Sequence, residues 1–507
     1  MRCVRAIVIA LMPAIVLASD PNQVRGFSPD RVYQIGDVDH VNVLNGNVIV
    51  RLPLGQVYRA GPTLEYQLAL TYNSKIWDYK FEDYSFPGCE SDPVGCSLRY
   101  GIPEKKSNAG FGWTLSLGRL IPATSEAPLR GWIYAAPDGS EHEFTDVISP
   151  PPPEAPGIFD PVRARTADGS FLRLDRYSPD RRDVSFPDGH IKTFDAAGNL
   201  TEMRDRHGNW IRIAYTAAQW TITDGYGEQT ARTHTIALVD KSGVFTQPNF
   251  QTLIGSVTLQ VFDDPQTAGG ETATYVFSYE DRWVGRGGGG ERASGHPDKC
   301  VTVPLLGTIG LPDGTLYEQT YKIIAGSLDT IPDSCIDPPG DPGFGVLDAD
   351  SGVIQSMRLP LRGSIEWVHG LYSMNLQECI NGAGYEAPYL GVKSRSFKDA
   401  DGTEISRWSY TPSLVPFGST TSQTCEGSYG TIPAPAEELI NEVEISSAGQ
   451  TLRTRHFFSA YPRGALTDAA GFSPNGFTWK EYGLPLTHKN PLQVMNPLDP
   501  ATTVPRL

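Results

Sequence analysis

The sequence predicts an all-β protein built from successive β-hairpins, and three features support this fold class. Short runs of β-branched and aromatic residues recur along the 507 residues, separated by Asp-Gly and Asn-Gly turn signals. The chain has 52 Gly and 41 Pro, which suits a backbone that reverses direction often. Its 22 Tyr and 20 Phe against 6 Met favour pleated sheets over helix bundles. A sandwich, a barrel or a solenoid-like sheet would each fit this spacing.

The first eighteen residues have the pattern of a secretory signal peptide. Arg2 and Arg5 precede an apolar run from Ala6 to Leu17, and Ala18 ends a small-residue cleavage site. The run is too short to span a bilayer comfortably. We therefore expect cleavage after Ala18, export to the periplasm, the cell surface or the medium, and no transmembrane anchor.

Turn signals and composition divide the remaining chain into four predicted parts. These are an N-terminal β-rich domain over residues 19–148, a hairpin ladder over 158–240, a further hairpin array over 250–485 and a poorly ordered tail over 486–507. Pro150 to Pro153 stand between the first two parts, either as a stiff connector or as a long hairpin loop. The clearest single strand runs from Leu64 to Tyr72, where strict alternation predicts one buried and one wetted face.

The ladder is clearest over residues 186–226, where four tight turns follow one another. Each turn contains an Asp, which can accept hydrogen bonds from the backbone two residues on, and a Gly, which adopts a positive φ without steric cost. The turn-forming candidates within this ladder are Asp188, Gly189, Asp195, Gly198, Asp205 and Gly208.

Six cysteines remain after the predicted removal of Cys3 with the signal peptide. An even number in an exported chain favours disulfides. We expect nearest neighbours to pair, which gives Cys89–Cys96, Cys300–Cys335 and Cys379–Cys425. A zinc site is disfavoured because the sequence has no CxxC and no His at ligand spacing from any pair.

The net charge of −16 and the lack of any Lys/Arg cluster longer than two residues exclude the electrostatic pattern of a nucleic-acid-binding protein. No catalytic motif is found: GxSxG, HExxH and the P-loop are all absent. The Gly-rich stretch 285–290 is followed by a segment without helical periodicity, so it is interpreted as a loop. A glycoside hydrolase would need only two suitably spaced carboxylates, so it stays the weaker alternative.

Two kinds of binding site are weighed from residue type alone. For calcium, the candidates are Asp348, Asp350, Asp399 and Asp401, which lie in pairs beside a Gly, although the full EF-hand spacing is missing and the default expectation is no cofactor. For a cell-surface glycan, the candidate stacking residues are Trp77, Trp132, Trp210 and Trp220, with core packing as the alternative for each.

The ladder resembles the Rhs/YD-repeat family. The matching stretches are Gly189-His-Ile-Lys-Thr-Phe194-Asp195-Ala-Ala-Gly198-Asn199-Leu200 and Asp205-Arg-His-Gly208-Asn209. Phe194 replaces the usual Tyr, Asn199 replaces the usual Arg, and Thr216 stands where a second unit should have Asp. The N-terminal blocks GNVIVRLPLG and SNAGFGWTLSLGRL also look like the entry region of large exported Rhs-type chains.

The resemblance implies a β-sheet that spirals into a hollow shell, with a structural and non-enzymatic role at the cell surface or in secreted complexes. In that family the shell often encloses a C-terminal toxin, and the repeats are associated with carbohydrate binding. The family's self-cleaving core segment and a toxin are not recognised in this sequence. The expected partner is therefore a second Rhs-type polypeptide or a toxin cargo, with a carbohydrate-binding surface module as the alternative function.

Overall fold

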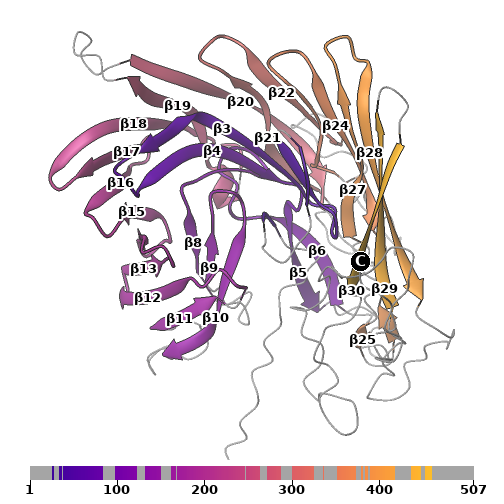
Figure 1. Ribbon diagram of the computed structural model, residues 1–507, viewed down its shortest axis with the longest axis horizontal. Coiled ribbons are helices and arrows are strands. Elements are labelled where there is room, and N and C mark those ends of the chain that lie inside the picture. Colours follow the sequence, from indigo (N-terminus) through magenta and orange to yellow (C-terminus); the bar gives the residue numbers. More distant parts are fainter. Residues whose placement is uncertain are drawn as a thin grey trace, which may run out of the picture.

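The computed structural model confirms an all-β fold that forms two packed layers (Figure 1). It describes residues 25–27, 33–36, 38–83, 97–122, 132–149, 162–166, 168–245, 247–262, 271–286, 300–324, 335, 351–372, 378–380, 383–385, 389–416, 436–446 and 451–459. Within these ranges the helical conformation is confined to a 3-10 turn, η3 (Pro248–Phe250), and to Cys335, which is also in a 3-10 conformation. No helix in this part of the chain is long and apolar enough to cross a membrane.

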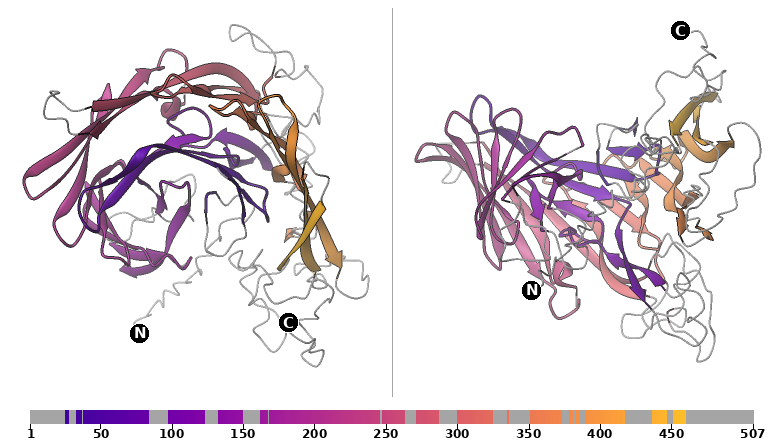
Figure 2. Two further views of the ribbon diagram at one scale, coloured as in Figure 1. Left: turned by 45° about the horizontal axis from the view of Figure 1, so that its top comes forward. Right: turned by 90° about the horizontal axis from the view of Figure 1, so that it is seen from below.

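The outer sheet is one antiparallel sheet of 19 strands, and it curves into an open arch (Figure 2). Its strands pair in chain order, except that β24 pairs directly with β27. They are β10 (Glu141–Ser149), β11 (Arg163–Thr166), β12 (Arg173–Ser178), β13 (Arg181–Ser185), β14 (Ile191–Phe194), β15 (Leu200–Arg204), β16 (Asn209–Tyr215), β17 (Gln219–Tyr226), β18 (Gln229–Asp240), β19 (Thr252–Phe262), β20 (Glu271–Gly285), β21 (Cys300–Gly310), β22 (Leu316–Tyr321), β23 (Ile354–Arg358), β24 (Ser364–Tyr372), β27 (Tyr389–Lys398), β28 (Glu404–Pro416), β29 (Ala436–Ser446) and β30 (Thr451–Ser459).

Two short strands extend the first edge of the outer sheet. β8 (Arg119–Ile121) pairs with β9 (Ile133–Ala135), and β9 pairs with β10. β8 then touches the ladder again, because the Leu120 N–H donates to the Gly198 carbonyl at 2.9 Å. A single bridge also joins Arg119 to Asn199. The first part of the outer sheet is therefore rolled up and held at this contact.

The inner sheet lies under the concave side of the arch (Figures 1 and 2). Its five strands have the order β1-β2-β3-β4-β7. They are β1 (Tyr33–Ile35), β2 (Asp39–Asn42), β3 (Val48–Arg59), β4 (Glu65–Asn73) and β7 (Trp113–Leu115). Two separate hairpins complete the fold: β5 (Trp77–Asp83) with β6 (Ser97–Pro103), and β25 (Glu378–Ile380) with β26 (Ala383–Tyr385).

β4 shows both the success and the limit of the alternation pattern. Every second residue from Leu64 to Tyr72 is predicted to point inward, and each of these side chains is at most 4% exposed. The opposite face was expected to be wetted, and Glu65 is exposed. Ala69 and Thr71 on that face are nevertheless buried, at 0 and 2% exposed. The Thr71 hydroxyl donates to the Pro137 carbonyl, so the loop after β9 covers this end of the strand.

The predicted domain limits do not separate the two layers. Residues 19–148 supply the whole inner sheet, but they also supply β8, β9 and most of β10 to the outer sheet. The ladder and the later hairpin array are consecutive parts of one sheet, since β18 pairs with β19. The predicted signal peptide, residues 1–18, and the predicted tail, residues 486–507, lie outside the described residues.

One hydrophobic core joins the layers. The inner sheet and its loops contribute Tyr58, Tyr72 and Trp113, and the outer sheet contributes Phe144 and Phe194, all less than 2% exposed. Full burial of an aromatic or aliphatic side chain of this size stabilises the fold by about 1.5–3 kcal/mol. At these residues the concave face of the arch therefore packs against the inner layer.

Candidate functional site

Asp and Gly build three of the four predicted ladder turns, whereas Asp224 and Gly225, predicted as the fourth, lie within β17. Gly189, Gly198 and Gly208 have φ values of 90°, 80° and 87°. Asp188, Asp195 and Asp205 each accept backbone N–H bonds through Oδ1, from His190, from Asn199 and from both His207 and Asn209, respectively. Three hydrogen-bonded turns of this type keep the ladder hairpins tight.

Asp205 also anchors the ladder to the inner layer. Its Oδ2 accepts a hydrogen bond from the Thr63 hydroxyl at 2.5 Å, and the Asn209 side chain donates to the same atom at 2.6 Å. Burial raises the pKa of this carboxyl, but the hydrogen bonds outweigh it and lower the pKa to about 2. The carboxylate form therefore holds both the turn and the contact between layers.

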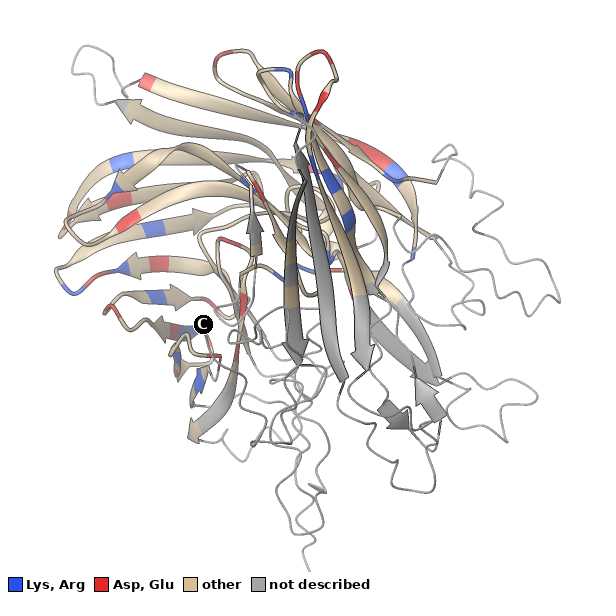
Figure 3. Ribbon diagram, turned by 45° about the vertical axis from the view of Figure 1, so that its right-hand side comes forward, with Lys and Arg blue, Asp and Glu red and all other residues tan. Residues whose placement is uncertain are grey.

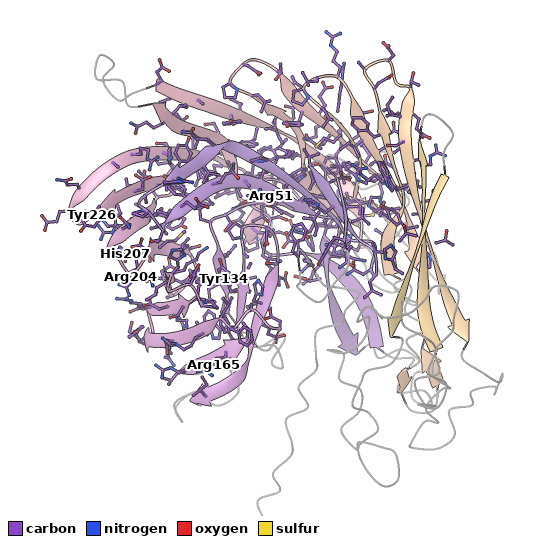
Figure 4. All side chains as sticks on the ribbon, viewed as in Figure 1. Arg51, Tyr134, Arg165, Arg204, His207 and Tyr226 are labelled. Carbon is purple, nitrogen blue, oxygen red and sulfur yellow. A yellow bond between two sulfur atoms is a disulfide. The ribbon has the colours of Figure 1, made fainter. Side chains whose placement is uncertain are left out.

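The two faces of the ladder differ in chemistry. In β16, Ile211 and Ile213 point into the core, while Arg212 lies on the outer face and pairs with Glu202 of β15 at 2.9 Å. Figure 3 shows charges of both signs across these strands. Figure 4 shows Tyr226 and His207 at the outer ends of hairpins, and Tyr134 in the interior. The outer face is thus a set of paired cross-strand charges.

A buried ion pair fixes the end of the inner sheet to the far side of the arch. Asp39 in β2 is 0% exposed and accepts two hydrogen bonds from the Arg395 guanidinium in β27, both at 2.6 Å. The Trp367 indole N–H in β24 donates to the same carboxylate at 2.9 Å. Bidentate geometry with a third donor satisfies the buried charge, which would otherwise be costly.

A hydrogen-bonded chain joins the middle of the inner sheet to the ladder. Tyr66 of β4 donates to Asp224 Oδ2 of β17 at 2.9 Å, and Arg232 pairs with the same carboxylate at 2.9 Å. His234 Nε2 lies 2.8 Å from the Tyr66 hydroxyl. Because the Gln260 N–H donates to Nδ1, the neutral imidazole carries its proton on Nε2 and donates it to Tyr66.

Burial controls the protonation of this chain. It lowers the pKa of His234 to about 4, with Asp224 acting in the opposite direction and Arg232 in the same one. Burial also raises the pKa of Tyr66 above its usual value, and the neighbouring Asp224 carboxylate raises it further. The imidazole and the phenol are therefore both neutral near pH 7, and the arrangement is a structural link between the layers.

Aromatic side chains complete the contact between layers. The Trp113 indole N–H of β7 donates to the Tyr321 hydroxyl of β22 at 2.7 Å, and Tyr321 donates to the Leu306 carbonyl. The Tyr72 hydroxyl accepts a hydrogen bond from the Ile354 N–H at 3.0 Å. The Trp113–Tyr321 bond joins residues that are 208 positions apart in the sequence, and the Tyr72–Ile354 bond joins residues that are 282 positions apart.

The tryptophans expected as glycan platforms lie mainly in the interior. Trp77 and Trp132 are 4% exposed and Trp210 is 6% exposed, so their ring faces are covered by protein. Trp132 stacks under the Arg182 guanidinium at 4.1 Å, and the Trp210 N–H donates to the Gly227 carbonyl. Trp220 is half-buried and packs edge-on against a neighbouring Tyr ring. Trp77 and Trp132 belong to the hydrophobic core, whereas Trp210 lies on the same face of β16 as Arg212, whose guanidinium covers its ring at 4.2 Å.

The calcium candidates are only partly described. Asp348 and Asp350 lie outside the described residues. Asp399 Oδ1 accepts the backbone N–H groups of Asp401 and Thr403 at 3.0 and 2.8 Å, as in a capped hairpin turn. In the described part of the chain, no three His, Cys, Asp or Glu side chains gather where they could hold a metal ion.

One of the three predicted disulfides is confirmed. Cys300, the first residue of β21, is bonded to Cys335, with their Cα atoms 5.4 Å apart. Cys89, Cys96 and Cys425 lie outside the described residues, and of Cys379 only the backbone, in β25, is described.

Sequence reasoning did not find the polar residues that join the layers. Asp39 and Arg395 are separated by 356 positions, and Tyr66 and His234 by 168. None of them stands in a motif, so no local pattern marks them. The one usable signal was the alternation in β4, which placed Tyr66 on the buried face, where a phenol needs a partner.

Comparison with known proteins gives limited similarity. No protein-family model and no curated protein matches the sequence. A TcdB2-TccC3 crystal structure is similar over 89% of this chain, with 11% identity and a TM-score of 0.24, and this chain spans only 20% of that one. The N-terminal domain of the effector SpvB from Salmonella typhimurium strain LT2 is similar over 72% of this chain and 93% of its own, with 14% identity and a TM-score of 0.14. Neither structure assigns a function to this chain.

Proposed function

We propose that this chain is an exported, non-enzymatic structural protein of the Rhs/YD-repeat type that forms part of a shell wall around another polypeptide. The observation that carries the proposal is the continuous 19-stranded sheet, which curves as an open arch around the inner sheet. A wall of this kind needs stiffness more than it needs a reactive site. Its outer face carries paired charges across the strands of the ladder.

Stiffness comes from links spread along the arch. Asp39 with Arg395 holds one end, Trp113 with Tyr321 holds the centre, and Tyr66 with Asp224 holds the ladder. Each link is buried, and removal of one partner from a buried charged pair typically costs about 3–5 kcal/mol. Because the three links lie at different places along the arch, they support a fixed curvature of the outer sheet.

The last strand supplies the edge at which the wall would continue. In the described part of the chain β30 pairs with β29 alone and the sheet is not closed, so one row of the β30 backbone N–H and C=O groups faces away from the sheet. An edge of this kind templates pairing with a further strand. We propose that a second Rhs-type polypeptide adds its first strand there.

Two proline substitutions in β30 test this edge. Consecutive N–H groups in a strand point to opposite edges, so one of Arg453→Pro and Thr454→Pro removes a bond to β29 and the other removes only an outward N–H. The chain would be co-expressed with the polypeptide encoded immediately downstream, and the complex would be isolated by size-exclusion chromatography.

The proposal expects a 1:1 complex in which the β30 amides are protected from hydrogen exchange. The variant that keeps the free chain's thermal stability should abolish the complex. Two outcomes would argue for the surface-module alternative. In the first, both variants form the complex normally. In the second, no complex forms and a glycan array reports specific binding. Export is tested separately, because a secreted chain that begins at Met1 would contradict cleavage after Ala18.

A further inference from the structure

A cavity of about 640 Å³ lies between the inner layer and the ladder. Its floor is the concave face of β15 to β18. Its other walls are the segments around residues 102–108 and 114–119 and the η3 turn. A volume of this size lies within the range of small-molecule sites, which are commonly about 300–1,000 Å³.

The floor of the cavity is apolar. Leu200, Ile213, Ile222 and Ile236 line it from four adjacent strands, and Trp220 stands beside them. Leu200, Ile222 and Ile236 are each 1% exposed, so the floor is preformed by the sheet. It can bury the hydrocarbon part of a ligand without reorganisation, and about 0.8 kcal/mol per CH₂ group is gained by such burial.

The opposite walls are cationic. Among the described lining residues are Lys105, Lys106, Arg119 and Arg286, and none of the described lining residues is an Asp or Glu. Of these cations, Lys106 is already paired with a carboxylate. Glu141 pairs with Lys106 and Arg25, and Glu104 accepts bonds from the Lys106 N–H and the Ser107 hydroxyl.

Two polar atoms in the walls have no partner within the described chain. The Nε of Arg119 and the Oε1 of Gln247 are buried without a hydrogen bond. A buried donor or acceptor left unsatisfied costs about 1–3 kcal/mol. The Arg119 Nε therefore indicates a missing acceptor, whereas the Gln247 Oε1, an acceptor itself, would need a donor. Arg119 belongs to β8, which docks on the ladder at Gly198, and its backbone position is therefore fixed.

We propose that this cavity binds a small anionic amphiphile, with its carboxylate or similar oxyanion on Arg119 and its hydrocarbon part on the floor of β15 to β18. A guanidinium pairs with planar oxyanions through two parallel N–H bonds, which suits Arg119 better than the point charge of a Lys. The site is partly open and has a volume of about 640 Å³, which suits a short amphiphile better than an extended acidic peptide. The proposal is independent of the shell role, since it concerns only the ladder and the inner layer.

Dodecanoate, used below its micelle concentration, is the probe. Isothermal titration should give one site per full-length chain. Dodecyltrimethylammonium, which has the same hydrocarbon chain and the opposite charge, should bind at least ten-fold more weakly. Added salt should weaken the binding of dodecanoate and should not weaken the binding of dodecyltrimethylammonium. This comparison uses the unaltered protein, so it does not depend on the folding of any variant.

Matched variants locate the site. Arg119→Gln should weaken dodecanoate binding about ten- to hundred-fold, because it removes charged hydrogen bonds. Arg212→Gln, on the outer face of β16 and paired with Glu202, should leave the binding unchanged. A dodecanoate brominated at its far end should quench tryptophan fluorescence, and Trp220→Phe should remove that quenching while binding persists.

Besides a failure to detect any binding of dodecanoate, three results would overturn the proposal. They are equal binding of the two oppositely charged amphiphiles, an unchanged dissociation constant in Arg119→Gln, and displacement of dodecanoate by an acidic octapeptide that binds more tightly. The last result would assign the cavity to a polypeptide segment.

Discussion

Replacing Gly198 with Ala is the sharpest test of how the ladder is docked. Gly198 has a φ of 80°, and a Cβ placed there would lie 1.7 Å from the Leu120 carbonyl oxygen of β8. Gly189, one hairpin earlier, has a φ of 90° and no atom within 4 Å of its Cβ position. The two substitutions share the backbone penalty and differ in the contact alone.

The expected magnitudes follow from that difference. A positive φ costs Ala about 1–2 kcal/mol, of which about 0.5 kcal/mol is offset because Ala restricts the unfolded chain. Gly189→Ala should therefore lower the free energy of unfolding by about 1 kcal/mol. Gly198→Ala must also displace β8, which adds about 1–3 kcal/mol of overpacking and about 1 kcal/mol for the lost bond from the Leu120 N–H to the Gly198 carbonyl. Its total should be about 3–5 kcal/mol.

Urea denaturation followed by intrinsic fluorescence measures both values. The m-value should stay the same in Gly189→Ala, because the surface exposed on unfolding is unchanged. If the two variants differ by less than about 0.5 kcal/mol, the Gly198 turn does not pack on β8 and the rolled-up start of the outer sheet is wrong.

Three further predictions concern the links between layers and the disulfide. Asp39→Asn should destabilise the fold by about 3–5 kcal/mol, because it leaves the Arg395 guanidinium buried without a counter-charge. The folded-state pKa of His234 lies below its unfolded value, so the neutral imidazole supports the fold above about pH 6.5. As the pH drops from 6.5 to 4, protonation of His234 should lower the free energy of unfolding by up to about 3 kcal/mol. Substituting serine at both Cys300 and Cys335 opens a link between residues 35 positions apart and should cost about 4 kcal/mol by the chain-entropy relation.

Each of these predictions has a control in the same chain. Asp401→Asn, at an exposed hairpin turn, should change the free energy of unfolding by less than about 0.5 kcal/mol. His234→Asn should reduce the acid-dependent loss between pH 6.5 and 4, to which His369 also contributes because burial lowers its pKa, whereas His207→Asn, at an exposed hairpin tip, should leave it in place. A reducing agent should lower the stability of the parent protein by more than that of the double serine variant, and the difference is the contribution of the Cys300–Cys335 disulfide. If a control variant changed the stability as much as the variant it is matched with, the role assigned to that residue or disulfide would be wrong.

Much of the fold could be predicted because its signals are local. The Asp and Gly residues of the ladder lie within four positions of the backbone groups they control, so a turn such as Asp195 to Asn199 is encoded by its own few residues. The alternation in β4 likewise encodes which face is buried. The Cys300–Cys335 disulfide followed from proximity in sequence and an even cysteine count.

The candidate site could not be predicted in the same way. Whether a Trp on a strand packs inward or faces solvent depends on what covers it, and Trp132 is covered by Arg182 from a later strand. The burial of Thr71 depends on a loop near Pro137. The cavity at Arg119 exists because β8 returns to the ladder at Gly198, a contact between residues 78 to 80 positions apart.

By itself, the sequence determined that this protein is a chain of antiparallel hairpins, because turn chemistry and period-two burial act over a few residues. Only the tertiary structure decided that the hairpins form one curved sheet around the N-terminal strands, with Asp39 on Arg395 and Tyr66 on Asp224 and His234. Curvature and layer packing depend on contacts between side chains hundreds of positions apart. No local pattern encodes such contacts, and the free energy that selects them is that of the whole buried interface.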